Sequence, residues 1–299
     1  MKIAITGSTG MVGSHLVEAL RARGDQVLRL VRGAPRGSEE VRWEPESGIP
    51  DVAALEELDG VVHLAGENIA ARRWSDAQKE RIRKSRTRGT TVLVNSLSKL
   101  RKPPRAFVSA SAIGFYGDTG DRKVDETAPA GSGFLPEVCR AWEDASKPME
   151  AQGSRVAHLR FGVILSPEGG ALKKMLLPFK MGLGGALGSG KQGMSWVSLR
   201  DVVAALTFAL DRDLAGPVNV VAPGACSNHH FTKALGRALG RPTILPMPAF
   251  AAKLAFGELA EDLLLASAWV RPAVLEGAGF RFQDREVGPA LQRMLGSDS

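Results

Sequence analysis

Three glycines follow an apolar run near residue 1 of this 299-residue chain. Residues 3–13 read IAITGSTGMVG, so Gly7, Gly10 and Gly13 form a Gly-x-x-Gly-x-x-Gly pattern. Between a strand and a helix, the first such glycine permits a tight turn and the second lets a ligand approach the backbone, while the third lets the helix pack close to the strand. The helix N-terminus then offers free N–H groups and a positive dipole end to phosphates.

The glycine pattern therefore predicts a binding site for the pyrophosphate of a dinucleotide, because the glycines stand between a predicted strand and a predicted helix. The alternative is a glycine turn that serves packing alone. The predicted contacts come from the turn and the first residues of the helix: Gly7, Thr9, Gly10, Met11, Val12 and Gly13.

An arginine, Arg32, follows the second predicted strand, Gln26–Val31. NAD sites usually have Asp or Glu at this point, which accepts from the ribose 2′-hydroxyl. A guanidinium instead suits a 2′-phosphate, and a hydrogen bond to a charged group contributes about 1.5–3 kcal/mol, or roughly 10- to 100-fold in affinity. The sequence thus predicts NADP, or NADPH when reduced, in preference to NAD. The alternative is that Arg32 is only a surface residue.

Short apolar runs alternate with helix-like stretches along the chain. Strands are predicted at residues 2–6, 26–31, 60–65, 106–110, 155–161 and 217–221. Helices are predicted at residues 10–23, 75–100, 136–152 and 199–211. This alternation predicts an α/β fold, with a Rossmann-type, doubly wound parallel sheet covered by helices on both faces.

Two segments depart from the alternation. Residues 166–195 are rich in glycine, and residues 223–299 hold further helices and a proline-rich stretch. We predict that the NADP-binding Rossmann domain spans residues 1–165 and is continued by residues 196–222. The two departing segments would form a smaller, C-terminal substrate-binding lobe at the carboxyl ends of the strands, where ligands bind in open α/β folds.

Composition narrows the classes of partner. The net charge of +7 suits an anionic ligand, but no base-reading motif accompanies it, so we predict no nucleic-acid partner. The two cysteines, Cys139 and Cys226, lack the spacing of a zinc site, so no metal is predicted. Without a secretory pattern or an apolar run of about 20 residues, we expect a cytoplasmic protein with no membrane segment, as a monomer or homodimer.

Several segments resemble the short-chain dehydrogenase/reductase superfamily in its extended or atypical branch. SASAIGFYG at residues 109–117 resembles the active-site segment of strand four, and GSGKQGMSWVSLRD at residues 188–201 resembles the substrate side of nucleotide-sugar epimerases. The chain is more similar still to an epimerase-family subgroup of unknown substrate, some members of which are labelled "cell division inhibitor". The matching stretches lie at residues 63–74, 84–86, 142–143, 159–172, 177–192 and from 241 onward.

The resemblance implies further cofactor contacts. By similarity, NADP would contact Val31, Arg32, Leu64, Ala65, Arg81, Arg86 and Val163. Small residues at Ala65 and Gly66 would let the adenosine half lie against the backbone, and Glu67 would help to order cofactor or substrate. Ser109 and Arg160 complete the cofactor-binding candidates.

The superfamily's catalytic pair is missing from the matching helix. Its reductases use Tyr-x-x-x-Lys, in which the lysine lowers the pKa of the tyrosine. Here Leu135 stands at the tyrosine position and Cys139 at the lysine position. We interpret Cys139 as a small buried side chain rather than a redox-active thiol.

Two other residues remain as catalytic candidates, Tyr116 and Ser111. Tyr116, the chain's single tyrosine, would line the pocket, donate a proton in a rearranged site, or simply pack. Ser111 lies one residue from the position of the superfamily's serine. His63, inside an apolar run, is interpreted as a core histidine with a local hydrogen bond rather than a catalytic residue.

The substrate side is predicted from the epimerase-like segment. Backbone donors of the glycine-rich loop, together with Lys191, would bind an anion there, and Trp196 is the second substrate candidate. The sequence therefore predicts an NADP-dependent oxidoreductase or nucleotide-sugar-epimerase-like enzyme with an unknown small substrate, which the basic residues allow to be anionic. The alternative is a catalytically reduced NADP-binding sensor or regulatory module.

Overall fold

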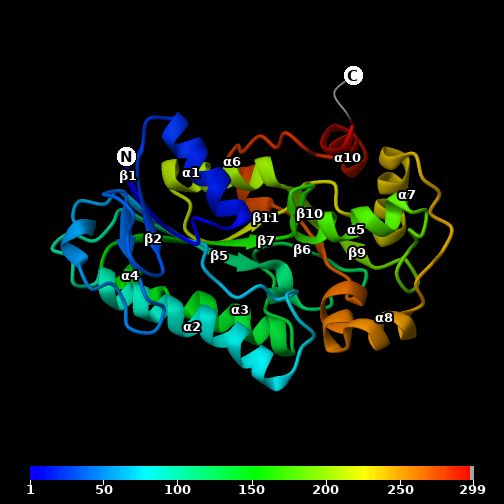
Figure 1. The fold of residues 1–299 in the computed structure, drawn as a ribbon, viewed down its shortest axis with the longest axis horizontal. Coiled ribbons are helices and arrows are strands. Elements are labelled where there is room, and N and C mark those ends of the chain that lie inside the picture. Colours follow the sequence, from blue (N-terminus) through cyan, green and yellow to red (C-terminus); the bar gives the residue numbers. More distant parts are fainter. Residues whose placement is uncertain (297–299) are drawn as a thin grey trace.

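A seven-stranded parallel sheet forms the centre of the computed structural model, which describes residues 1–296 (Figure 1). The strand order is β11-β7-β5-β4-β1-β2-β3. The strands are β1 Lys2–Thr6, β2 Gln26–Val31, β3 Glu40–Arg42, β4 Gly60–His63, β5 Ala106–Ala112, β7 Arg155–Phe161 and β11 Gly216–Val220. The chain changes direction across the sheet between β1 and β4, which is the switch point at which such folds bind ligands.

Helices cover both faces of this sheet. On one face lie α1 (Met11–Ala22) and α6 (Leu199–Asp211), and on the other lie α2 (Asp76–Leu97), α3 (Phe134–Asp144) and α4 (Lys147–Ala151) (Figure 1). This arrangement confirms the predicted doubly wound Rossmann-type fold.

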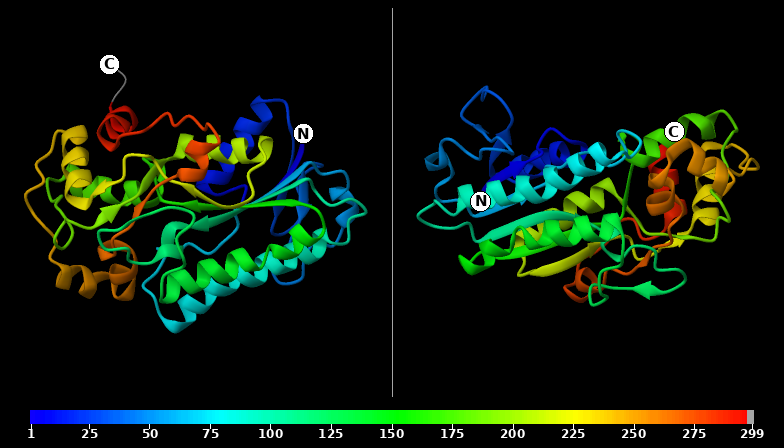
Figure 2. Two further views of the ribbon diagram at one scale, coloured as in Figure 1. Left: turned by 180° about the vertical axis from the view of Figure 1, so that it is seen from behind. Right: turned by 90° about the horizontal axis from the view of Figure 1, so that it is seen from below.

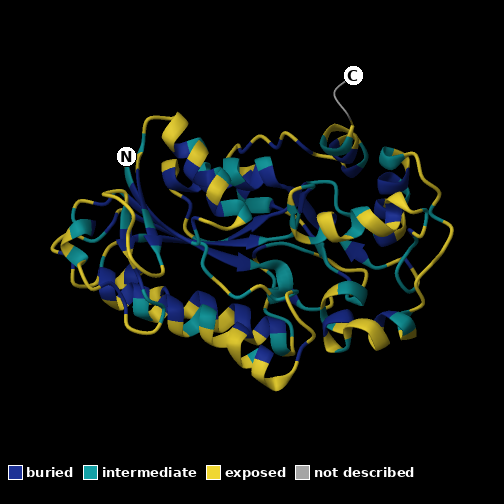
Figure 3. Cartoon of the chain, in the orientation of Figure 1, coloured by how far each residue is buried: buried dark blue, intermediate teal, exposed yellow. Residues whose placement is uncertain are grey.

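Alternation along the strands supplies a core on each face. Ile3 and Ile5 of β1 are fully buried in the cluster that includes α1 and α6, whereas Ala4 between them belongs to the cluster under α2. Successive side chains of a strand point to opposite faces, so a strand covered on both sides must be apolar throughout. Figure 3 shows the sheet as an almost continuous buried layer.

The predicted helix at residues 136–152 is in fact two helices. Helix α3 ends at Asp144, and α4 begins at Lys147 with Pro148 in its first turn. Proline lacks an N–H and disfavours helical backbone in the residue before it, so it suits the start of a helix and not its middle. The strand predicted at residues 60–65 also ends early, at His63.

Most of the remaining elements gather beyond the carboxyl ends of the strands (Figure 2). They include α5 (Gly170–Lys180), α7 (Asn228–Leu239), α8 (Ala249–Phe256), α10 (Val287–Leu295) and a π-helix, Ala260–Leu265. Helix α9 (Ala273–Gly277) instead packs against β11, with Leu275 in the core of the sheet. Three two-stranded pairs join them: β8 Val163–Ser166 with β10 Trp196–Ser198, β9 Gly193–Met194 with β12 Cys226–Ser227, and β6 Lys123–Val124 with β13 Trp269–Val270. Their apolar core includes Leu172, Trp196, Phe231 and Leu291.

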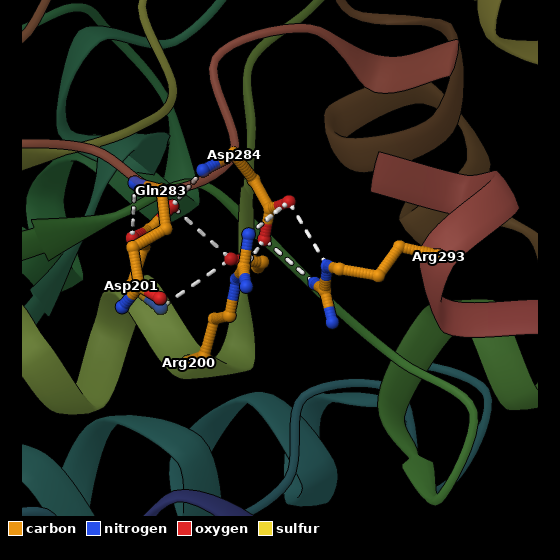
Figure 4. Close-up of polar contacts among 6 residues, drawn as sticks. Arg200, Asp201, Gln283, Asp284 and Arg293 are labelled. Carbon is orange, nitrogen blue, oxygen red and sulfur yellow. Dashed lines mark hydrogen bonds and ion pairs between the residues drawn. The ribbon is translucent and has the colours of Figure 1, made fainter. Parts of the chain in front are cut away.

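A polar network fastens the C-terminal segment to α6 (Figure 4). The Asp201 carboxylate accepts from the backbone N–H groups of Gln283 and Asp284, each at 2.9 Å. Asp284 in turn pairs with Arg200 and Arg293, each at 2.7 Å. Burial alone would raise the pKa of Asp284, but the hydrogen bonds from the two arginines outweigh it and hold the pKa below its ordinary value. Within residues 1–296, no helix combines the length and the apolar content needed to cross a bilayer.

Candidate functional site

The glycine turn fits closely against the end of β4. Gly7 has a φ of +67°, and a Cβ at this position would lie 2.9 Å from the backbone nitrogen of Ala65. A Cβ on Gly13 would lie 2.2 Å from the carbonyl oxygen of Gly7. At Gly10 the tightest contact would be 3.3 Å, to that same oxygen. The chain's own packing thus demands Gly7 and Gly13, whereas Gly10 leaves an open approach to the backbone.

The amino end of α1 follows directly and has no capping side chain. Its N-cap is Gly10, and the first turn carries no acidic residue. The first N–H groups of a helix have no partner within the helix itself. Met11, Val12 and Gly13 therefore present uncapped donors at the switch point of the sheet, as an anion site requires.

Arg32 lies exposed just beyond β2. The neighbouring arginines Arg29 and Arg42 form ion pairs with Glu40 and Glu44. Arg32 has no hydrogen-bond or ion-pair partner within residues 1–296. Its guanidinium is consequently available to an anion at the same edge of the sheet, beside half-buried Val31.

A second guanidinium that forms no ion pair, that of Arg86 on α2, contacts the residues that follow β4. Arg86 of α2 donates from Nη1 to the carbonyl oxygens of Glu67 (3.1 Å) and Ile82 (3.3 Å). Its guanidinium carbon lies 4.9 Å from the ring centre of Trp142 and 3.7 Å from a Cβ placed on Gly66. Burial lowers the pKa of Arg86, yet arginine remains charged at neutral pH. In the part of the chain that the structure describes, Arg86 forms no ion pair, and the nearby Glu67 carboxylate offsets only part of the effect of burial on its pKa.

Other cofactor candidates surround Arg86. Leu64 and Ala65 are half-buried, and Gly66 is exposed. Gln78 connects two candidates, since it donates to Glu67 and accepts from Arg81. The structure therefore brings the glycine turn and the residues after β4 together, with Arg86 reaching the latter from α2 and Arg81 connected to them through Gln78.

The positions of the missing catalytic pair are filled by packing side chains. A Cβ on Gly114 would lie 3.4 Å from Leu135 Cβ and 3.8 Å from Cys139 Sγ, so both side chains face the turn that follows β5. Burial raises the pKa of the Cys139 thiol to about 12. A thiol that remains protonated at neutral pH is a poor nucleophile, which favours the interpretation of Cys139 as a packing residue.

Tyr116 and Ser111 belong to one buried network. The Tyr116 hydroxyl donates to Asn219 Oδ1 (2.8 Å) and accepts from Arg160 Nη1 (2.9 Å). Ser111 donates to Glu143 Oε1 at 2.7 Å. Arg160 joins the two candidates, because its Nε and Nη2 each donate to Glu143 at 2.8 Å. The sequence missed Asn219, but Glu143 had a signal, because it matches an acidic residue that follows the superfamily's catalytic pair.

This network leaves the Tyr116 proton on an internal acceptor. Burial raises the pKa of Tyr116, and Arg160 and Asn219 offset that effect only in part. The geometry thus favours packing among the interpretations of Tyr116. Arg160 is also largely occupied, since its guanidinium carbon lies 3.4 Å from the ring centre of Phe115. Ser109 is fully buried in β5 and donates to the Ala110 carbonyl oxygen.

The substrate candidates are not brought together. Lys191 is exposed, and its backbone N–H donates to Ser189 Oγ at 3.2 Å. Trp196 is fully buried, with its indole N–H donating to the carbonyl oxygen of Gly224 at 3.0 Å. Val163, a cofactor candidate, is half-buried and pairs with Trp196 between β8 and β10.

Comparison with models of protein families shows which family this chain matches. A model described as the NAD dependent epimerase/dehydratase family matches residues 3–222, which include nearly all of the sheet, the glycine turn, Arg32 and Arg86. The chain belongs to this family. A second model, a domain of unknown function (DUF1731), matches residues 247–294.

Individual relatives agree with this assignment. An epimerase family protein of Mycobacterium bovis is 49% identical over 290 residues, covering 97% of this chain and 96% of its own. The crystal structure of the human epimerase family protein SDR39U1 (isoform 2) with NADPH matches with a TM-score of 0.90 and 32% identity, covering 99% of each chain. These findings confirm the resemblance to an atypical epimerase-family subgroup.

A more distant structure shows the fold alone. The UDP-glucose 4-epimerase of Thermus thermophilus, in complex with NAD, matches with a TM-score of 0.75 and 21% identity, covering 99% of this chain and all of its own. The same fold is thus found with NADPH in one solved structure and with NAD in another.

Proposed function

We propose that this epimerase-family protein binds NADPH at the switch point of its sheet and acts as an atypical NADP-dependent oxidoreductase or epimerase-like enzyme on a small substrate. The observation that carries the proposal is the uncapped amino end of α1 at the switch point, together with two guanidinium groups that form no ion pair within residues 1–296: Arg32 just after β2 and Arg86 over Gly66. The NADPH bound to the human relative supports the same conclusion.

The residues present suit this cofactor. The N–H groups of Met11, Val12 and Gly13 would bind the pyrophosphate, and the space at Gly10 would admit it. Arg32 would bind the 2′-phosphate, which a carboxylate at this point would repel. Arg86 would add a positive charge beside the residues that follow β4. NADPH supplies a hydride from its nicotinamide ring when bound.

Proton transfer is the step for which the chain has no standard group. Leu135 and Cys139 replace the tyrosine and lysine of the superfamily, and Tyr116 donates its proton to Asn219. An enzyme built this way would draw its proton from the substrate itself or from water. The same observation favours a second candidate function, an NADP-binding sensor or regulatory module that has lost catalysis.

One assay separates the two candidate functions. NADPH oxidation would be followed by its absorbance in the presence of aldehydes, ketones and nucleotide sugars, for the wild-type protein and for Tyr116→Phe. An oxidoreductase oxidises NADPH with at least one compound. If Tyr116 is only a packing residue, Tyr116→Phe oxidises NADPH at the wild-type rate at a temperature where both proteins are folded. Tight NADPH binding without turnover across the panel would identify the sensor, and the absence of NADPH binding would refute both.

A further inference from the structure

A histidine that the proposed function does not use lies between two threonines at the end of β4. His63 is fully buried, and its Nδ1 lies 2.7 Å from Thr6 Oγ1 while its Nε2 lies 3.0 Å from Thr90 Oγ1. The rings of Trp43 and Phe107 lie nearby, with their centres 5.9 Å and 6.3 Å from that of the His63 ring. Burial lowers the pKa of His63 to about 4, so the ring is neutral at physiological pH.

The contacts of Thr6 fix the direction of the first hydrogen bond. Thr6 Oγ1 already accepts from the backbone N–H groups of Leu64 (3.1 Å) and Ala65 (3.2 Å). A hydroxyl has two acceptor lone pairs and one proton. Both lone pairs are engaged, so Thr6 donates its proton, and Nδ1 of His63 is the acceptor.

The contacts of Thr90 give the direction of the second bond independently. Thr90 Oγ1 lies 2.5 Å from the carbonyl oxygen of Arg86. A carbonyl oxygen only accepts, so Thr90 donates to it and has no proton left for the ring. His63 Nε2 must therefore carry a proton and donate it to Thr90. The two ends of the ring require the same neutral tautomer.

We infer that His63, as the neutral tautomer protonated on Nε2, is a positioning residue that ties the glycine turn to the turn of α2 carrying Arg86. The hydrogen bonds run from the amides of Leu64 and Ala65 through Thr6, His63 and Thr90 to the Arg86 carbonyl. This role rests on the proposed cofactor function, because the segments joined by these hydrogen bonds would all hold NADPH. They are the glycine turn, the residues after β4 and the turn of α2 that carries Arg86.

The hydrogen bonds through His63 join parts of the proposed cofactor site whose distance from one another must stay fixed. Thr6 directly precedes Gly7, and the backbone atoms of Leu64 and Ala65 lie so close to that glycine that a Cβ on it would be within 3.0 Å of both residues. Arg86 holds its guanidinium over Gly66 from the neighbouring helix. Releasing the His63 link would leave each segment folded but free to shift relative to the other, and displacement of a charged donor lowers affinity.

The tautomer can be tested without any cofactor. Nitrogen NMR of the wild-type chain, with labelled histidine, distinguishes a protonated ring nitrogen from an unprotonated one. We expect a protonated Nε2 and an unprotonated Nδ1 for His63 at neutral pH. A protonated Nδ1, or a doubly protonated ring, would overturn the inference.

The positioning role is tested by NADPH affinity in matched variants. His63→Asn retains an acceptor near the Nδ1 position but loses the bond to Thr90, and Thr90→Val removes the same bond by an isosteric change. The control is His158→Gln, because buried His158 makes an equivalent bond to Ser146, at 2.7 Å, beneath the junction of α3 and α4. Each of the first two variants should raise the NADPH Kd about tenfold, as the loss of one such bond predicts.

The outcomes separate this role from general stability. The inference holds if His158→Gln changes the Kd less than about twofold while lowering the melting temperature as much as the other two variants. It fails if Kd follows melting temperature in all three, or if Thr90→Val binds NADPH as the wild type does. A wild-type chain that binds no NADPH would instead refute the proposed function, while the nitrogen spectra would still decide the tautomer.

Discussion

Some arginines of this chain pair with a carboxylate and others do not, and Arg32 and Arg86 at the candidate cofactor site are among those that do not. Arg160 is paired with Glu143, and Arg200 with Asp284, both through short contacts. Arg32 and Arg86 have no ion pair within residues 1–296, although Arg86 is half-buried. A partly buried charge without an ion-pair partner is costly, and such groups are found often at functional sites.

Replacing Arg86 should therefore weaken NADPH binding more than it lowers the stability of the fold. We expect Arg86→Met to weaken NADPH binding at least about tenfold, because a charged hydrogen-bond donor is lost. Its melting temperature should be unchanged or higher, since the desolvated guanidinium is replaced by an apolar side chain of similar length. Calorimetric titration and thermal unfolding measure the two effects.

Arg160→Met provides the matched control, because it leaves Glu143 buried without its partner. That change should lower the free energy of unfolding by about 3–5 kcal/mol. If Arg86→Met were equally destabilised and bound NADPH normally, Arg86 would be a structural residue like Arg160.

At the scale of elements, periodicity predicted the long strands and helices well. The bounds of β1, β2, β7 and α6 agree with those expected from the apolar pattern. Two-residue strands such as β9 and β12 have no period to detect, and Pro148 had to be recognised as the start of α4 and not as part of a continuous helix. Helix α5 was hidden because it begins at Gly170, in a segment whose glycines resemble a loop.

The candidate site was predictable where the signal was local. The glycine spacing predicted the phosphate-binding turn, and the arginine after β2 suggested the 2′-phosphate contact. Tertiary partners were not predictable in this way, because Tyr116 and Asn219 are 103 residues apart, and Thr6 and His63 are 57 apart. Only the fold brings such pairs together.

The contact between α1 and the glycine turn yields a paired prediction. Gly13→Ala should destabilise the protein, because its Cβ would lie 2.2 Å from the Gly7 carbonyl oxygen. Gly10→Ala should be destabilised less than Gly13→Ala, since its nearest contact would be 3.3 Å rather than 2.2 Å, but its methyl group would enter the space proposed for the pyrophosphate and weaken NADPH binding. Urea unfolding and NADPH titration of both variants provide the measurements. Normal NADPH affinity in Gly10→Ala would show that the pyrophosphate does not approach the backbone there.

At the scale of the whole molecule, contacts from loop and helix residues after β4 connect the sheet domain to the helices at the carboxyl end. Lys79 pairs with Glu258 at 2.9 Å, and Lys174 donates to the carbonyl oxygen of Ala70 at 2.7 Å. Lys79 and Glu258 are both substantially exposed, and exposed pairs contribute only about 0–1 kcal/mol.

Stability of the whole molecule should decrease on the acid side of neutrality. The pKa of His63 falls from an ordinary 6.5 to about 4 on folding, so below pH 6.5 the unfolded chain binds a proton that the folded chain does not. Stability is then lost progressively as pH falls from about 6.5 to 4, by about 3 kcal/mol from this group. Asp284, whose pKa is lowered by its arginines, adds a further loss only below about pH 4.

Urea unfolding of the wild type and of His63→Asn, at neutral pH and near pH 4.5, measures the contribution of this histidine. The variant should lose less stability between the two pH values than the wild type does. An equal loss in both proteins would show that His63 does not resist protonation in the folded state. His158, whose pKa burial also lowers, would supply the slope that remains.

Calorimetric titration of the wild-type protein and of Arg32→Glu with NADPH and with NADH is the most direct measurement. The wild type should bind NADPH roughly 10- to 100-fold more tightly than NADH, and the variant should lose most of that preference. If neither dinucleotide bound to the wild type, the amino end of α1 would not be a cofactor site, and the proposed function would be refuted.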